Sequence, residues 1–208
     1  METKILLGGG GSAEDEQPVL QRFASWIGRE GSLLYLPVAM ADPGQAQFDW
    51  ISGALDSLGA GQIEMWTDMQ QHDPTELARY DGIFIGGGNT YHLLNELRTA
   101  GFIQALVDFA NSGRALYGGS AGAILIGRDI ATCAHMDENI VGISDTRGLD
   151  LVHGRAIWCH YTPADAPLIR AYTARAQISV IALSETSGLW IQGPDQTSQL
   201  GSPPVLYD

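Results

Sequence analysis

A chain of 208 residues with 45% hydrophobic content is long enough to bury the core of one domain and short for two. Its formal net charge of −13, from 24 acidic against 11 basic residues, disfavours nucleic acid and membranes as partners and favours a small ligand. The chain has no run of 18 apolar residues and no signal-peptide pattern, and Cys133 and Cys159 form no disulfide framework, so we expect a cytoplasmic protein.

Short apolar runs alternate with longer amphipathic segments, which predicts strands that alternate with helices. The runs that predict strands lie at residues 4–10, 32–38, 62–66, 82–88, 114–119, 155–160 and 178–185. Helical patterns lie at residues 18–27, 45–58, 90–97 and 102–111, from Ala121 onward, and near 167–175. Because the strands are apolar throughout, we expect an α/β fold with a mostly parallel sheet and helices on both faces.

Two regions depart from this alternation. Residues 129–154 are polar and irregular, which indicates an excursion that carries an extra strand or a lid. The tail from Gly193 is expected to form a closing hairpin or an edge piece. No internal repeat, low-complexity tract or linker divides the chain, so residues 1–208 are predicted to form a single α/β domain. The oligomeric state stays open, with a homodimer among the alternatives.

Ligand sites in a parallel α/β sheet lie where strands end, and three of the predicted strands end in glycine-rich turns. The first turn, at residues 8–13, nominally fits the dinucleotide pattern G-x-G-x-x-A. That pattern also needs an acid at the end of the second strand, where residues 36–39 are Leu-Pro-Val-Ala, so dinucleotide binding is disfavoured. The chain has no Gly-Lys-Ser/Thr, which excludes a Walker phosphate loop.

The second glycine-rich turn surrounds a serine, in the sequence Gly-Gly-Ser-Ala-Gly at residues 118–122. It lies between a strand pattern and a helix pattern, which is the setting of a nucleophile elbow. Such a turn strains its central residue and brings neighbouring chains into contact, so the flanking side chains must be small. Ser120 is therefore a candidate nucleophile, and the Ala121 amide is a candidate oxyanion donor. The same sequence also fits an ordinary helix N-cap.

The third glycine-rich turn has the sequence Gly-Gly-Gly-Asn-Thr at residues 86–90. Neighbouring parallel strands would place Gly87 and Gly88 beside the serine turn, where one amide would be the second oxyanion donor. Asn89 or Thr90 would cap the next helix, and Asn89 is also a candidate substrate-binding residue. A turn and cap without a ligand is the alternative.

The segment GGGNTYHLL followed by GGSAGA resembles the peptidase E family of serine aspartyl dipeptidases, to which cyanophycinase is related. The resemblance spans nearly the whole chain, and the pair of motifs is more specific than either alone. It implies a flavodoxin-like or glutamine-amidotransferase-like fold, with Ser120 in place of the amidotransferase cysteine and with a histidine and an acid further along the chain. The chain departs from the family pattern at Gly119 and Ile124, which bears on the shape of the pocket more than on the nucleophile.

A serine hydroxyl needs an adjacent base, and the chain has five histidines. His160 ends the apolar strand Ala-Ile-Trp-Cys-His, at the sheet edge where Ser120 is expected. Its setting, Trp-Cys-His-Tyr, resembles that of the peptidase E histidine. The other four lie in a polar turn, in the helix after the third glycine turn and in the irregular excursion, where surface or packing roles suit them better: His72, His92, His135 and His153.

An acid should hold the base in one tautomer and stabilise its cation. Glu185 follows the last apolar strand and can reach the same edge, and its setting ALSETSGLWI resembles that of the family's glutamate. Asp137 is the rival, because HMDENI resembles a second acidic position of the family, and Asp145 and Asp150 are weaker candidates. Any of these carboxylates could instead be a solvated loop charge.

Together these residues predict a hydrolase that acts by acyl transfer: Ser120 attacks a peptide carbonyl, His160 carries the proton and Glu185 orients His160. The resemblance implies a dipeptidase, and a small peptide is the expected partner. No cofactor is required, and no metal is expected because the cysteines and histidines lack recognised zinc spacing. An esterase or amidase on small acyl substrates, or an inactive binding module of the same fold, are the alternatives.

The aspartate preference of the peptidase E family has no evident support in this chain. A carboxylate side chain in a dry pocket needs a cationic partner, and in the family a basic residue lies between the histidine and the following helix. Here that segment, HYTPADAPLIRAY, contains Asp165 and has no basic residue before Arg170, which falls in the helix pattern. We therefore expect cleavage of short peptides from the N-terminus without a strong preference for aspartate; the alternative is that Arg170, another loop or a partner subunit supplies the charge.

Overall fold

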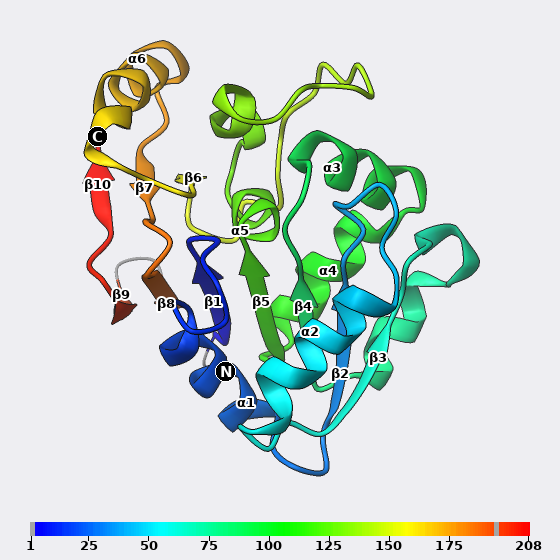
Figure 1. Ribbon diagram of the computed structural model, residues 1–208. Coiled ribbons are helices and arrows are strands. Elements are labelled where there is room, and N and C mark those ends of the chain that lie inside the picture. The colour runs from blue at the N-terminus through cyan, green and yellow to red at the C-terminus, as the bar shows by residue number, and fades with distance from the viewer. Residues whose placement is uncertain (1–2, 194–195) are drawn as a thin grey trace.

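The computed structural model describes residues 3–193 and 196–208, and its centre is a seven-stranded sheet (Figure 1). The strands of this sheet are β1(Ile5–Gly8), β2(Ser32–Leu36), β3(Gln62–Met65), β4(Gly82–Ile85), β5(Ala115–Gly119), β8(Ser187–Gly193) and β9(Gln196–Gly201). Their order is β3-β2-β4-β5-β1-β8-β9. The first five strands in this order run parallel, whereas β8 is antiparallel to β1 and β9 is antiparallel to β8.

Helices cover both faces of this sheet, because alternate strand residues point to opposite faces and most are apolar. Leu6 packs into a core with the helices on one face, and its neighbours Ile5 and Leu7 pack into the core on the other face. The first face carries α1(Gln17–Ile27) and α2(Gln45–Asp56), and the second carries α3(Thr90–Thr99), α4(Phe102–Asn111) and α5(Ala121–Ile126). The predicted fold class is confirmed.

The strand register brings the three glycine-rich turns together. Gly118 of β5 lies opposite Ile85 of β4 on one side and opposite Leu7 of β1 on the other. The carboxyl ends of these three parallel strands are therefore level, and the turns that follow them meet at one edge of the sheet. This edge holds the candidate nucleophile.

The sequence predicted one sheet, and this is wrong, because two of the predicted strands belong to a second, three-stranded sheet. Its strands are β6(Ala156–Trp158), β7(Val180–Ala182) and β10(Val205–Tyr207), in the order β10-β7-β6. The antiparallel strand β8 occupies the edge of β1, so that edge is closed to β6 and β7. Helix α6(Ala166–Ala176) packs on the small sheet through Ile169 and Tyr172.

The excursion at residues 129–154 contains no strand, so the predicted extra strand is wrong. It consists of the 3-10 helix η3(Ile130–His135), turns, and one isolated bridge between Asp129 and Arg147. The Arg98 guanidinium donates hydrogen bonds to the carbonyl oxygens of Asp145 and Arg147, which a strand partner would otherwise satisfy. The other 3-10 helices of the described residues are η1(Met69–Gln71), η2(Pro74–Arg79) and η4(Pro163–Asp165).

The C-terminal tail supplies edge strands, as its sequence predicted. β9 is the outer strand of the large sheet and β10 is the outer strand of the small one. The hairpin between β8 and β9 begins at Ser187, earlier than the predicted Gly193, and residues 194–195 lie outside the described residues. Within residues 3–193 and 196–208, no helix has the length and apolar character that crossing a bilayer requires.

Candidate active site

Ser120 occupies the turn between a strand and a helix, since β5 ends directly before it and α5 begins directly after it. Its φ of 50° is positive, which a residue with a side chain rarely adopts. A Cβ at Gly118 would lie 2.5 Å from the carbonyl group of Gly122, and a Cβ at Gly122 would lie 2.1 Å from the carbonyl oxygen of Ile85. Close backbone packing therefore explains why glycines surround this serine.

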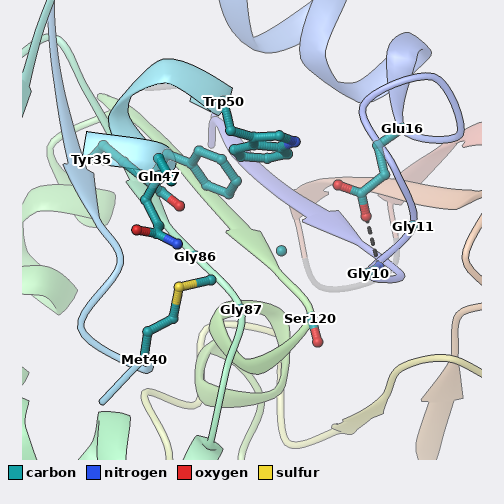
Figure 2. Close-up of a pocket in the computed structure, with 13 residues that line it drawn as sticks. Gly10, Gly11, Glu16, Tyr35, Met40, Gln47, Trp50, Gly86, Gly87 and Ser120 are labelled. Carbon is teal, nitrogen blue, oxygen red and sulfur yellow. Dashed lines mark hydrogen bonds between the residues drawn. The ribbon is translucent and has the colours of Figure 1, made fainter. Parts of the chain in front are cut away.

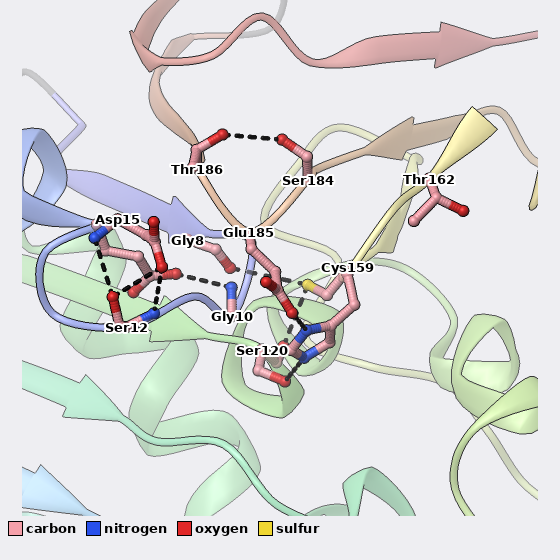
Figure 3. Close-up of polar contacts among 12 residues, drawn as sticks. Gly8, Gly10, Ser12, Asp15, Ser120, Cys159, Thr162, Ser184, Glu185 and Thr186 are labelled. Atoms are coloured by element: carbon pink, nitrogen blue, oxygen red, sulfur yellow. Dashed lines mark hydrogen bonds and ion pairs between the residues drawn. The ribbon is translucent and has the colours of Figure 1, made fainter.

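His160 lies beside Ser120, with Nε2 2.9 Å from the serine Oγ (Figure 3). The histidine follows β6 by two residues and also has a positive φ, of 53°. Its backbone N–H donates to the carbonyl oxygen of Gly9 at 2.9 Å, which ties the histidine to the turn after β1. The side chain is 33% exposed, so the ring reaches solvent on one side.

Glu185 extends the contact into a chain of hydrogen bonds. Its Oε1 lies 3.1 Å from His160 Nδ1 (Figure 3). An ionised carboxylate can only accept a hydrogen bond, so Nδ1 carries the proton, and in a neutral ring Nε2 is then the acceptor that faces the Ser120 hydroxyl. The Glu185 side chain is 62% exposed, so the carboxylate approaches the ring from the solvent side.

The turn after β1 packs against these three residues, a role that its sequence pattern did not reveal. Gly10 has φ 99°, and a Cβ there would lie 2.5 Å from the His160 ring and 2.9 Å from Ser120 Cβ. A Cβ at Gly11 would lie 2.3 Å from the carbonyl oxygen of Glu185. The run of glycines that resembled a dinucleotide loop thus lets the backbone lie against the site.

Gly87 lies on another side of Ser120, and Gly88 follows it in the chain. A Cβ at Gly87 would lie 3.2 Å from Ser120 Cβ and 3.6 Å from its Oγ. Gly88 has φ 138°, and a Cβ there would lie 2.5 Å from the carbonyl oxygen of Ala39. The Gly88 N–H has no hydrogen-bond acceptor within the described part of the chain, and the Ala121 N–H opens α5 without an intrahelical partner. Both amides are therefore available to a ligand.

The side chains of Asn89 and Asp137 form hydrogen bonds at the N-terminus of α3. The Asn89 side-chain oxygen accepts from the His92 N–H at 2.9 Å, and its Nδ2 donates to the carbonyl oxygen of Glu138 at 2.8 Å. Asp137 Oδ2 accepts from the Thr90 N–H at 2.8 Å. Asn89 is thus a helix cap, and Asp137 is bound to the helix start and not to an imidazole.

The weaker acidic candidates also have other partners. Asp145 pairs with Arg147, with 2.7 Å between carboxylate and guanidinium. Asp150 accepts from the Gly154 N–H at 2.9 Å. Both contacts lie within the excursion at residues 129–154, so these carboxylates organise that segment.

Two of the remaining histidines are packing residues. The His72 ring stacks on Trp66 with a centroid distance of 3.8 Å, and the His135 ring stacks on Trp158 at 4.0 Å. His135 Nδ1 also lies 2.9 Å from the carbonyl oxygen of Thr132. Each of these rings thus packs on a tryptophan, and neither is bonded to Ser120 or Glu185.

A buried glutamate, Glu16, lies behind the turn after β1 and was not among the predicted site residues. It is 4% exposed and accepts hydrogen bonds from the Gly10 N–H, at 2.7 Å, and from the Tyr117 hydroxyl. Burial raises the pKa of Glu16, and the hydrogen bonds from Tyr117 and Gly10 oppose that rise. An acid just before a helix usually interacts with the helix N-terminus, so the sequence offered no distinct signal.

A cavity of about 340 Å³ opens beside Ser120 (Figure 2). Figure 2 shows the side chains of Tyr35 and Trp50 on one side of this cavity and Glu16 on the other, with Ser120 at its edge. The Phe84 ring, Met40, Gln47 and several glycines also line it. The aromatic residues come from strands and a helix whose sequence patterns indicated only core or surface positions.

Comparisons with known proteins point to one family. The model of peptidase family S51 matches residues 5–199. A peptidase E of Shewanella sp. (strain ANA-3) is 32% identical over 166 residues, which cover 73% of this chain and 69% of the relative. An uncharacterized peptidase of Listeria monocytogenes is 29% identical over 151 residues, which cover 68% of this chain and 72% of the relative.

Two solved structures share the fold. The first, from Listeria monocytogenes EGD-e and described provisionally as a peptidase E protein, has a TM-score of 0.77 and 23% identity, and the match covers 98% of this chain and 100% of that one. The second, a peptidase from an acI-B1 Actinobacterium, has a TM-score of 0.67 and 18% identity, with 99% and 94% covered. At these identities the likeness concerns the fold alone.

Proposed function

Because the chain belongs to peptidase family S51, we propose that it is a serine peptidase that hydrolyses dipeptides or short peptides from the N-terminus. The observation that carries this proposal is the chain of hydrogen bonds from Ser120 Oγ to His160 Nε2, at 2.9 Å, and from His160 Nδ1 to Glu185 Oε1, at 3.1 Å. In such an arrangement a histidine takes the proton of a serine while a carboxylate orients the histidine.

In the acylation step, Ser120 Oγ attacks the carbonyl carbon of the peptide bond and His160 Nε2 takes the hydroxyl proton. The tetrahedral intermediate then loses its C–N bond, and His160 returns the proton to the leaving amine. The N-terminal residue stays attached to Ser120 as an ester. Glu185 keeps the proton on Nδ1, so that Nε2 is free to act as the base.

In the deacylation step, water replaces the departed amine. His160 Nε2 takes a proton from the water, whose oxygen attacks the ester carbonyl. The C–O bond to Ser120 breaks, the serine oxygen recovers the proton from His160, and the N-terminal residue leaves as a free amino acid. The partly exposed His160 ring is suited to this step, because solvent water reaches it.

The negative oxygen of the tetrahedral intermediate needs two donors. The proposed oxyanion donors are the N–H groups of Ala121, which directly follows Ser120, and of Gly88, which follows the Gly87 that lies against Ser120. Gly87 leaves room for the substrate carbonyl, and Asn89 holds the turn by capping α3. The positive φ of Ser120 supports a nucleophile elbow, because strain at this residue holds the side chain out from the turn.

Strong preference for N-terminal aspartate is not part of the proposal. The Arg170 guanidinium packs over the Tyr207 ring, 5.9 Å from its centroid. Asp165 accepts from the Thr162 N–H at 2.7 Å, so it is engaged in its own turn. Between His160 and α6 the chain therefore offers no cation for a substrate carboxylate.

No cofactor enters the proposed mechanism, since each proton transfer uses a side chain of this protein or water. A cytoplasmic location is part of the same proposal. Cys133 and Cys159 are both buried and unpaired, which is the usual state of cysteines in a reducing compartment.

The test is a panel of dipeptides with a common C-terminal leucine, scored by release of the N-terminal amino acid from purified wild-type and Ser120→Ala protein. We expect release by the wild type alone, with kcat/KM for Asp-Leu less than about 10²-fold above that for Ala-Leu. Hydrolysis of p-nitrophenyl esters without dipeptides would favour an esterase. Failure of both reactions, with no fluorophosphonate label on Ser120, would indicate a binding module.

A further inference from the structure

The cavity beside Ser120 is walled by aromatic rings from three different elements. Tyr35 comes from β2, Trp50 from α2 and Phe84 from β4. Ring centroids lie 5.2 Å apart for Tyr35 and Phe84, and 6.1 Å apart for Trp50 and Phe84. The volume of about 340 Å³ is at the small end of the range of ligand pockets, about 300–1,000 Å³, and suits one large side chain.

Trp50 is the most exposed of the three aromatic residues that line the cavity. Its side chain lines the cavity although the residue is 41% exposed, whereas Tyr35 and Phe84 are each 2% exposed. An exposed tryptophan at the mouth of an apolar cavity leaves one ring surface in water until a ligand covers it. Removal of this surface from water favours an apolar or aromatic ligand.

The charges around the cavity oppose an acidic ligand. Glu16 lies in the lining, and no lysine or arginine does so among residues 3–193 and 196–208. The Glu16 carboxylate already accepts from the Gly10 N–H and the Tyr117 hydroxyl, so it needs no cation from a ligand. A second carboxylate here would lie beside the Glu16 carboxyl group, with no lysine or arginine in the lining to balance its charge.

The lining also indicates which residue of a peptide the cavity receives. Ser120 and Gly87 border the cavity, whereas His160 and Glu185 do not. In acyl transfer the residue whose carbonyl is attacked stays on the serine, and the leaving amine lies toward the histidine. The cavity is therefore on the side of the acyl residue, which in a dipeptide is the N-terminal one.

We propose that this cavity is the specificity pocket for the N-terminal residue, and that it selects a bulky apolar side chain, best an aromatic one, over small or acidic side chains. This inference rests on the proposed peptidase function and adds its substrate class. The peptidase E resemblance implies an acidic N-terminal residue, whereas this cavity favours an uncharged one. Trp50 is the residue that determines it.

The experiment measures kcat/KM for Phe-Leu, Ala-Leu and Asp-Leu with wild type and variants. We expect Phe-Leu to exceed Ala-Leu by about tenfold or more and Asp-Leu to be the poorest of the three. Trp50→Ala should remove most of the advantage of Phe-Leu, and Trp50→Phe should restore much of it. Leu168→Ala, an exposed apolar residue on α6 outside the cavity, is the matched control and should keep the wild-type ratios.

A binding measurement separates this inference from the peptidase proposal. Calorimetric titration of the Ser120→Ala variant with the same dipeptides needs no turnover, so it measures binding without the catalytic steps. Tighter binding of Phe-Leu than of Ala-Leu, lost on adding Trp50→Ala, would support the pocket even if wild-type hydrolysis failed. Equal binding of Phe-Leu and Ala-Leu, or the best kcat/KM with Asp-Leu, would overturn it.

Discussion

The site joins two parts of the molecule that hold their residues in different ways. Ser120 follows a central strand of the seven-stranded sheet, and its neighbours in the chain are buried. His160 and Glu185 follow β6 and β7 of the three-stranded sheet, and their side chains are 33% and 62% exposed. The serine is thus held by dense packing around its own turn, whereas the base and acid are held by contacts between the two sheets.

The turn after β1, residues 9–11, is one place where the two sheets meet, and we call it the junction. The carbonyl oxygen of Gly9 accepts from the His160 N–H, and Cys159 Sγ lies 3.4 Å from the carbonyl oxygen of Ser120. Burial raises the pKa of the Cys159 thiol well above its ordinary value, so the thiol stays neutral and packs as a small side chain. The position of Ser120 thus depends on the backbone geometry of its own turn, whereas the position of His160 depends on the junction.

The largest effect is expected from the pair that spans the junction. Ser120→Ala should lower kcat by about 10⁴-fold or more, and His160→Ala should be nearly as damaging. The double variant should be little worse than either, because the two residues act as one unit. Turnover of dipeptides by the pure variants, with melting curves as the folding control, checks this. Unchanged turnover in Ser120→Ala would rule out the serine mechanism.

The acid on the small sheet should matter less than the base. Glu185→Gln should lower kcat by about 10³-fold, since an amide orients the histidine less well but solvent reaches this exposed position. Asp137→Asn is the matched control, because an amide oxygen can still accept from the Thr90 N–H, and turnover should stay within about tenfold. The reverse ranking in steady-state kinetics would mean that Asp137 is the third residue of the mechanism.

The junction itself can be disturbed without substituting a residue of the proposed mechanism. Gly10→Ala should lower kcat by about 10²-fold, because its Cβ would push the His160 ring away from Ser120. Gly101→Ala is the control: φ is also positive, at 78°, but nothing lies within 4 Å of the added Cβ, so it should lose about 1 kcal/mol of stability and keep its turnover. Equal turnover in both variants would contradict the role of the junction.

The large sheet, and the edge of it where Ser120 lies, could be predicted from the sequence because each of the sequence patterns involved spans only a few residues. Apolar runs, helix patterns and glycine turns determine β1, β4 and β5 over a few residues each, and parallel order then brings their ends together. The catalytic roles of Ser120, His160 and Glu185 stay predictions. Their hydrogen bonds are properties of the structure that spacing alone could not supply.

The small sheet and the cavity could not be predicted, because their signals are not local. β6 and β7 are three residues long, and nothing in three apolar residues says which sheet they join. Trp50 has the spacing of an ordinary helix residue, and Glu16 occupies a common position before a helix. Only the fold brings Trp50 and Glu16 to the same cavity.

The smallest effect concerns Glu16, whose carboxyl group accepts a hydrogen bond from the Gly10 N–H of the junction. Burial raises its pKa above the ordinary 4.5, so the folded state favours the protonated form. That contribution to stability is present below pH 4.5 and is lost as pH rises through the raised pKa. The Glu16→Gln side chain stays neutral at every pH. The free energy of unfolding of this variant minus that of the wild type should therefore increase from about pH 4.5 upward and become constant above the raised pKa.

Urea denaturation of both proteins at a series of pH values measures this difference. The prediction concerns how the difference changes with pH, so it can be tested even if the variant is more or less stable than the wild type at every pH. Tyr117→Phe sharpens the test. It removes a hydrogen bond that favours the ionised carboxylate, so the pKa of Glu16 should rise further and the loss of stability with pH should be larger than in the wild type. If the difference in free energy of unfolding between Glu16→Gln and wild type is constant or falls with pH, ionisation of Glu16 does not destabilise the folded protein. The buried acid would then add nothing to the contrast between the two sheets.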